Sequence, residues 1–359
     1  MEMSLRKLKS MLIIAAVALV AVSCKDDDDD ADIIYMDGTL NFELPEFVRP
    51  GQILTLKPKG ISHPDDGIIG YCWKVSPSMA KNDTTRFLNG LDGDGKPSDG
   101  SFTHRFSDTL QTYTVYCIGF SEGYTSSSKS AKTTVVSPGP EKSITGSGIN
   151  TYRDQYFKAD GIEWYYATID ELDWFRQDLA MTGSGVPFRN NEAMDGVFGR
   201  FYSYEEAVNA CPEGWRLPTD ADWEALGKAL NGADDSVSYI HQPIPGIAGK
   251  LMANAYFNDI KMWEYWPSLG TITNESGMGM IPSGYASFSD PDKDGADYPV
   301  TFRGVYEYAA YWTADTAEDG KAYYRYLYCK YPDLMVGKAD TKTFGASVRC
   351  VRNNKTTLD

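Results

Sequence analysis

The sequence predicts a β-rich chain of two domains, an N-terminal β-sandwich followed by an α+β domain with two short helices and long loops. A chain of 359 residues exceeds what one ordinary hydrophobic core accommodates. Its 33 Gly and 18 Pro favour turns and strands over long helices. A Ser-, Pro- and Gly-rich segment at 137–142 interrupts the strand pattern. We therefore predict a sandwich over 36–137, a linker at 138–142 and a second domain over 143–359.

The N-terminus predicts export and lipid anchoring. A basic segment precedes an apolar run from Met11 to Val22, and small residues then lead to Cys24. This run is shorter than the roughly 20 residues that span a bilayer as a helix, which favours a cleaved signal over residues 1–23. The site resembles a bacterial lipobox, with Ala21 where Leu is usual and Ser23 where Gly or Ala is usual. Acylation of Cys24 would then anchor the chain. The alternative is ordinary cleavage near Ser23 with Cys24 unmodified.

Residues 24–35 predict an acidic tether. Lys25 is followed by an unbroken run, Asp26 to Asp30, which repels itself and cannot pack. The run resembles the signal that Bacteroidetes lipoproteins carry for export to the outer face of the outer membrane. The resemblance implies an outer-membrane protein facing the cell exterior. A formal net charge of −16 without a basic patch disfavours nucleic acid as a partner, and we expect none.

From Ile34 to Val136, short apolar runs alternate with Gly, Pro, Asp and Asn breaks, as is typical of a β-sandwich. Alternation in two strands puts every second side chain on one face, and we expect the two faces to meet in the core. This region resembles polycystic-kidney-type and immunoglobulin-like modules, with Trp73 as the core tryptophan. The alternating side chains are Tyr71, Trp73 and Val75 in one strand and Tyr113, Val115 and Cys117 in the other. The predicted strands are Leu40–Leu44, Ile53–Pro58, Ile69–Val75, Gly100–Phe106, Thr112–Ile118 and Ala131–Val136.

Two capping boxes predict the two helices of the second domain. Ser203 with Glu206 begins the first, and Thr219 with Asp222 begins the second. The expected buried positions, spaced as on one helical face, are Tyr204, Ala207, Val208 and Cys211 in the first helix and Trp223, Leu226 and Leu230 in the second. A strand is expected at Gly161–Tyr166, and three late strands at Ala309–Ala314, Ala322–Cys329 and Ala346–Arg352.

Three segments of this domain carry a specific resemblance. They are Glu205–Glu224, which contains Cys-Pro-Glu-Gly-Trp-Arg-Leu-Pro, then Tyr311-Trp-Thr313, and Gly345–Arg352. Together they resemble the Fibrobacter succinogenes major paralogous domain. That family is similar in fold to C-type lectin-like domains and to formylglycine-generating enzymes. The resemblance implies a lectin-like scaffold over roughly the last 200 residues.

The resemblance to lectin-like domains implies a disulfide between Cys211 and Cys350. Closing a loop of over ~100 residues removes about 4 to 5 kcal/mol of unfolded-state entropy in the simple chain model, and an exported protein retains such bonds. A bond between Cys72 and Cys117 remains open, because Cys72 is out of phase with the inward face. Cys329 is expected to be a buried free thiol.

No catalytic residues are predicted. The three histidines, His63, His104 and His241, lack metal-ligand spacing to Cys, Asp or Glu. A formylglycine-generating-type enzyme, which is one alternative, would need two reactive cysteines, and Cys329 alone is left near the C-terminal end. We therefore expect a protein that is not an enzyme.

One segment has the spacing of a calcium loop. Asp290, Asp292 and Asp294 occupy the first, third and fifth places of an EF-hand-type loop, with Gly295 at the sixth. The match then fails, because Thr301 stands where the bidentate Glu belongs. The Glu-Pro-Asn or Gln-Pro-Asp and Trp-Asn-Asp motifs of calcium-bridged sugar binding are absent from the sequence. We expect no cofactor, with calcium at the three aspartates as the alternative.

Aromatic residues of the loop-rich half are the candidate ligand contacts, because aromatic faces suit sugar rings and protein hot spots. We expect a glycan or a surface protein as ligand, in adhesion or nutrient capture. The alternative is a structural or fimbria-associated envelope protein without a small ligand. Trp215, Trp223 and Trp312 are assigned to the core. The candidates are Trp263, Tyr265, Trp266, Tyr285, Tyr306 and Tyr308.

Overall fold

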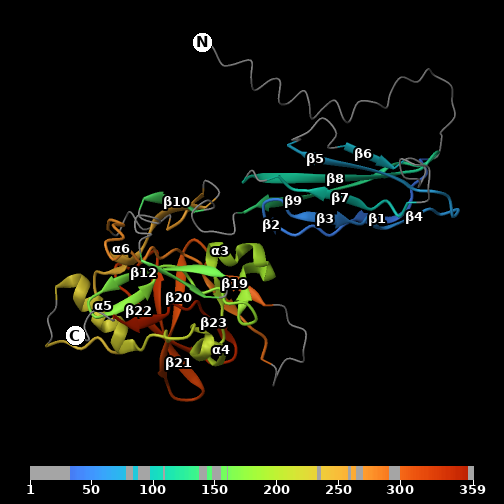
Figure 1. Cartoon of the computed structure of the whole chain (residues 1–359). Helices are drawn as coiled ribbons and strands as arrows, with labels where there is room; N and C mark the ends of the chain where they lie inside the picture. The colour runs from blue at the N-terminus through green and yellow to red at the C-terminus, as the bar shows by residue number, and fades with distance from the viewer. Residues whose placement is uncertain are drawn as a thin grey trace, which may run out of the picture.

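The computed structural model shows a β-rich chain with two domains that lie side by side (Figure 1). The signal segment, residues 24–32 of the acidic tether with Cys24, and the predicted linker lie outside the described residues. The structure describes residues 33–77, 84–87, 98–107, 110–136, 144–147, 155–159, 161–232, 236–257, 260–263, 270–290 and 300–354.

The N-terminal domain consists of two layers of strands. One layer is a five-stranded sheet of order β2-β9-β8-β5-β6, and the other contains the pairs β1-β4 and β3-β7. Six strands were predicted, and β2, β4 and β6 are additional. The strands are β1 (Asp37–Asn41), β2 (Phe47–Val48), β3 (Ile53–Leu56), β4 (Lys59–Ser62), β5 (Gly70–Ser76), β6 (Thr84–Phe87), β7 (Phe102–Arg105), β8 (Thr112–Phe120) and β9 (Ser127–Val135).

The sandwich core confirms Trp73 as its central tryptophan. Its ring is fully buried, packs against Phe42 at 5.1 Å between centroids, and donates its indole N–H to the Gly100 carbonyl at 2.8 Å. The two predicted faces are arranged differently from expectation. Strands β5 and β8 are neighbours in one sheet, with Trp73 opposite Cys117, so their inward faces form one continuous surface.

The C-terminal domain is built from several small sheets with helices around them. Their orders are β11-β12-β13-β24, β20-β21-β22, β19-β18-β23, β10-β16-β17 and β14-β15. The strands are β10 (Ile144–Ser147), β11 (Tyr156–Ala159), β12 (Ile162–Ile169), β13 (Leu172–Phe175), β14 (Val186–Pro187), β15 (Arg200–Phe201), β16 (Asn254–Phe257), β17 (Ile260–Lys261), β18 (Tyr285–Ser287), β19 (Thr301–Arg303), β20 (Tyr308–Thr316), β21 (Lys321–Tyr328), β22 (Met335–Asp340), β23 (Phe344–Gly345) and β24 (Val351–Asn353). The helices are η2 (Phe188–Asn190), η3 (Glu192–Met194), α3 (Asp195–Phe198), α4 (Tyr204–Ala210), α5 (Asp220–Asn231) and α6 (Ala248–Leu251).

Both predicted capping boxes are confirmed, at Ser203 for α4 and at Thr219 for α5. In each, the cap side chain accepts a bond from the N3 backbone, and the N3 carboxylate accepts one from the cap backbone. The assignment of Val208 to the buried face of α4 was wrong. Its side chain is 43% exposed, and Ala210 lies on the buried face instead.

The predicted strand Ala346–Arg352 also differs from the structure. Residues 346–352 do not form one continuous strand; β24 begins only at Val351 and pairs with β13. The preceding residues make isolated bridges to separate parts of the domain, including Ala346 to Tyr202 and Ser347 to Tyr311. This segment is almost fully buried, and buried backbone N–H and C=O groups need hydrogen-bond partners. Here the partners come from several separate segments of the domain and not from one neighbouring strand.

The disulfide between Cys211 and Cys350 is confirmed. It joins the end of α4 to the residue before β24 across a sequence separation of 139 residues. Cys72, Cys117 and Cys329 are free thiols, and Cys329 is buried as predicted. The end of α4 and the segment that leads into the closing strand β24 are therefore covalently tied.

We predict that replacing both Cys211 and Cys350 by Ser lowers the free energy of unfolding by about 2–5 kcal/mol, because the reduced chain regains the entropy of a long open loop. Denaturant titration of the oxidised wild type and the variant measures the change. Cys72→Ser, which removes an unbonded thiol, serves as the control. Equal midpoints for wild type and double variant would contradict the prediction.

Candidate functional site

An aromatic hollow lies where β20 and β21 meet β18 and β23. Its volume is about 440 Å³, within the range of about 300–1,000 Å³ typical of small-ligand sites. Five aromatic side chains and one carboxylate contribute to its wall. The lining residues are Tyr285, Gly304, Glu307, Tyr308, Tyr324, Tyr328 and Phe344.

The strand period brings the tyrosines to one face. Strands β20 and β21 are antiparallel, and their register pairs Tyr308 with Tyr328, Ala310 with Tyr326 and Trp312 with Tyr324. Because successive side chains of a strand alternate between faces, these six share one side of the ladder.

The rings hold one another in place. Tyr308 stacks on Tyr326 at 4.8 Å between centroids, and Phe344 contacts both Tyr285 at 5.3 Å and Tyr324 at 4.8 Å. The hydroxyls of Tyr308 and Tyr324 lie 3.3 Å apart in a hydrogen bond. Such ring packing leaves the wall of the hollow with few alternative rotamers.

Two glycines leave room for these rings. A Cβ at Gly337, which faces Tyr324 across the β21–β22 ladder, would lie 2.5 Å from the Tyr324 ring. Gly304 has a φ of +73°, and a Cβ there would lie 2.9 Å from the Cβ of Tyr308. The turn after Gly304 also bonds the Tyr308 N–H to the Gly304 carbonyl at 2.7 Å.

Burial keeps the tyrosine hydroxyls neutral. It raises the pKa of Tyr308, and the neighbouring Tyr324 phenol raises it further. Burial likewise raises the pKa of Tyr324 and that of Tyr326. At neutral pH the hollow therefore offers phenolic O–H groups that can donate and accept hydrogen bonds, and a single side chain of acidic type, Glu307.

A buried ion pair anchors β21 from its other face. Arg325 and Asp220 are both fully buried; Nε donates to Oδ1 at 2.6 Å and Nη2 to Oδ2 at 2.5 Å. Arg325 also donates to the carbonyls of Gln242 at 2.6 Å and Tyr239 at 2.8 Å. The guanidinium is thus bonded on three sides, as a buried charge requires.

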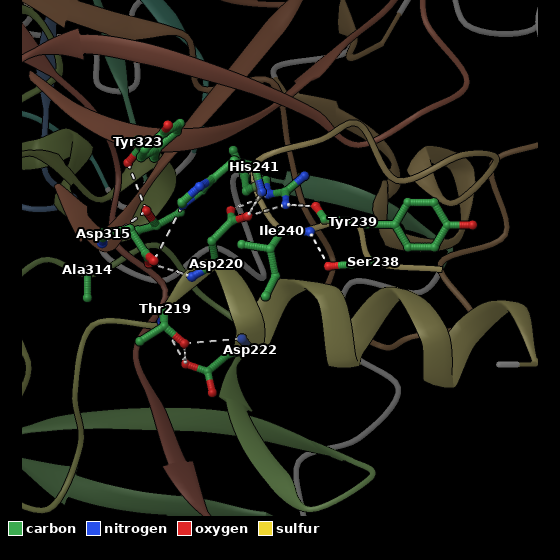
Figure 2. A network of polar contacts seen from close by, with 12 residues as sticks. Thr219, Asp220, Asp222, Ser238, Tyr239, Ile240, His241, Ala314, Asp315 and Tyr323 are labelled. Atoms are coloured by element: carbon green, nitrogen blue, oxygen red, sulfur yellow. Dashed lines mark hydrogen bonds and ion pairs between the residues drawn. The ribbon is translucent and has the colours of Figure 1, made fainter. Parts of the chain in front are cut away.

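Figure 2 shows the polar groups around Asp220 at the start of α5. The Asp220 N–H donates to Asp315 at 2.6 Å, and its carboxylate accepts the His241 N–H at 2.5 Å. The His241 ring stacks on Tyr323 of β21 at 3.6 Å between centroids. Strand β21 is therefore fixed to α5 on the face opposite to the hollow.

Only some of the predicted ligand contacts lie at the hollow. Tyr285 and Tyr308 line the hollow. Tyr306, with a φ of +72°, is partly buried against the cluster that contains Phe188 and is not part of the wall. Tyr265 and Trp266 lie outside the described residues, as do Asp292 and Asp294 of the candidate calcium loop, of which only Asp290 is described.

Trp263 belongs to the core, so its prediction as a ligand contact was wrong. Its ring has no exposed surface, and its indole N–H donates to the Met280 carbonyl at 3.0 Å. Tryptophans in aromatic loops give the same sequence signal whether they face solvent or fill a core. The core assignments of Trp215, Trp223 and Trp312 are confirmed by their burial.

Besides Gly304, four lining residues of the hollow were missed: Glu307, Tyr324, Tyr328 and Phe344. Tyr324, Tyr326 and Tyr328 alternate within the predicted strand Ala322–Cys329, and period two would have put them on one face. No comparable signal exists for Phe344, which reaches the hollow through pairing of β23 with β18.

Within the described residues, no group of three His, Cys, Asp or Glu side chains is arranged to hold a metal ion. None of the helices that can be described combines the length and apolar character needed to cross a membrane.

Residues 139–352 match the family model described as the Fibrobacter succinogenes major domain. The match includes every lining residue of the hollow, both disulfide cysteines and the Arg325–Asp220 pair. No curated protein matches the chain.

We predict that Tyr308 and Tyr324 of the hollow ionise only above the ordinary tyrosine pKa of about 10, because burial raises the pKa of both. A folded-state pKa above the unfolded value gives stability that is present below pH about 10 and lost as the pH rises further. Ultraviolet tyrosinate titration and alkaline unfolding measure both effects. Tyr308→Phe should reduce the alkaline loss of stability and cost about 1 kcal/mol near pH 7 through its lost hydrogen bond. Identical alkaline unfolding curves for wild type and Tyr308→Phe would refute this.

Proposed function

Because the chain belongs to the Fibrobacter succinogenes major domain family through residues 139–352, we propose that it is a surface lipoprotein whose lectin-like C-terminal domain binds a glycan. The single observation that carries this proposal is the aromatic hollow, with its five aromatic side chains. The family description states no ligand and no activity, so the proposal rests on the chemistry of the site.

The hollow has the composition of a sugar subsite. The C–H faces of a pyranose ring are apolar and pack on aromatic rings, while sugar hydroxyls require hydrogen-bond partners. Tyr285 and Tyr328 contribute rings to the wall, and Glu307 contributes a carboxylate side chain. The neutral tyrosine hydroxyls add donors and acceptors without attracting ions.

The proposed domain acts without catalysis. Cys329, the one free thiol of the C-terminal domain among the described residues, has no exposed surface, and burial raises its pKa. A buried protonated thiol is a poor nucleophile, which argues against the formylglycine-generating alternative. Two reactive thiols in the folded protein would restore that alternative.

The proposed location is the outer face of the outer membrane, with acylated Cys24 as the anchor. The apolar segment before Cys24 and the acidic run after it support this proposal. The glycan ligand would then be met outside the cell, in adhesion or nutrient capture.

We predict that the whole exported chain, extracted in detergent, binds a subset of host or dietary glycans on an array. Tyr285→Ala and Tyr328→Ala should each weaken this binding about tenfold or more, since losing one aromatic contact of about 1.4 kcal/mol changes affinity tenfold. Titration of the best array ligand measures the change.

Tyr256→Ala is the matched control, because Tyr256 is a partly exposed tyrosine of the same domain on β16, away from the hollow's wall. It should bind as wild type does. Silence of the wild-type chain across the array would reject the glycan proposal and favour the structural or fimbria-associated role.

We also predict that Cys24→Ser abolishes acylation and releases the protein from the membrane fraction. Mass spectrometry of the N-terminal peptide measures acylation. Replacing Asp26 to Asp30 by Asn should leave acylation intact and make the protein inaccessible to protease added outside intact cells. An unacylated wild-type Cys24 would refute the anchor, and protease-accessible Asn variants would refute the role of the acidic run.

A further inference from the structure

The two domains share a hydrophobic core. Phe47 and Val136 belong by sequence to the N-terminal domain, yet they pack in a cluster otherwise formed by the C-terminal domain. Phe47 is only 8% exposed, and Val136 has no exposed surface. Two side chains from the edge of the sandwich are therefore part of a core that the C-terminal domain otherwise forms.

Strand alternation explains how one segment serves both cores. Strand β2 pairs in parallel with β9, with Phe47 opposite Thr134 and Val48 opposite Val135. Val48 and Val135 point into the sandwich core, and their neighbours Phe47 and Val136 enter the shared cluster. The edge of the sandwich is thus part of the C-terminal core.

Aromatic rings surround Phe47 in this cluster. Its ring centroid lies 6.5 Å from that of Phe188 and 6.4 Å from that of Phe257. Phe188 in turn contacts Phe198 at 5.2 Å and Phe302 at 5.3 Å. These distances are those of direct ring packing.

Polar contacts fix the register of the same interface. The Asn191 side-chain N–H donates to the Phe47 carbonyl at 2.7 Å, while its Oδ1 accepts the Ala193 N–H at 2.9 Å. Arg49 donates to the Glu192 carbonyl at 3.0 Å. The bonds of Asn191 to Phe47 and of Arg49 to Glu192 join β2 and the residue after it to the η2–η3 segment.

The shared core leads to the aromatic hollow. Phe302 on β19 pairs with Ala286 on β18, and Ala286 belongs to the shared cluster. The preceding residue, Tyr285, points to the other side and lines the hollow. One short strand therefore has the domain interface on one face and the ligand wall on the other.

From this arrangement we infer that the two domains form a single rigid unit in which Phe47 positions β18 and hence the wall of the hollow. The N-terminal domain is then a supporting part of the binding site and more than a spacer. This inference concerns packing and does not depend on which ligand the hollow takes.

The test compares Phe47→Ala with Phe42→Ala in the whole exported chain. Phe47 packs in the shared cluster, and Phe42 packs only in the sandwich core. Hydrogen exchange read by mass spectrometry should accelerate on the order of tenfold in the β18 and β19 peptides of Phe47→Ala, because local opening of that region becomes easier. In Phe42→Ala the acceleration should be confined to sandwich peptides.

Small-angle scattering gives an independent readout, with a larger maximum dimension expected for Phe47→Ala. Asn191→Asp keeps the acceptor for Ala193 and loses the donor to Phe47, so it tests the interface where the Ala variant fails to fold. It should accelerate exchange in the same two peptides. Unchanged exchange at β18 and β19 in these variants would overturn the inference, whether or not glycan binding is found.

Discussion

The buried pair of Arg325 and Asp220 is the interaction on which the proposed site depends. Removing either partner from a fully buried pair leaves a charge without compensation, which typically costs about 3–5 kcal/mol. In the intact pair, the desolvation cost of burying the guanidinium is offset because it also bonds two carbonyls. Since Arg325 lies between Tyr324 and Tyr326 in β21, the position of this charge sets the position of the tyrosines on the opposite face.

The hollow exists because small residues alternate with large ones around it. Ala310 lies opposite Tyr326, and Gly337 lies opposite Tyr324, so each ring has a small neighbour across the ladder. A Cβ at Gly337 would collide with the Tyr324 ring and push it away. The cavity is thus a property of residue pairs across strands, which only the register can reveal.

The sequence was most informative where the signal is local. Capping boxes at Ser203 and Thr219, and alternation through Trp73, each depend on residues a few positions apart, and each matches the structure. The disulfide came from a family resemblance and is also present. The site was predictable only in part: Tyr285 and Tyr308 were selected by residue type, while Phe344 depends on a long-range strand pairing that leaves no local pattern.

The same limit applies to the domain boundary. A composition change at 137–142 identifies where two domains are connected, but not how much surface they bury against each other. Phe47 looks like any apolar residue of an edge strand, and its partners Phe188 and Phe257 are more than a hundred residues away. Because Ala286 links that contact to Tyr285 through one strand, a substitution at the boundary can alter the hollow without touching it.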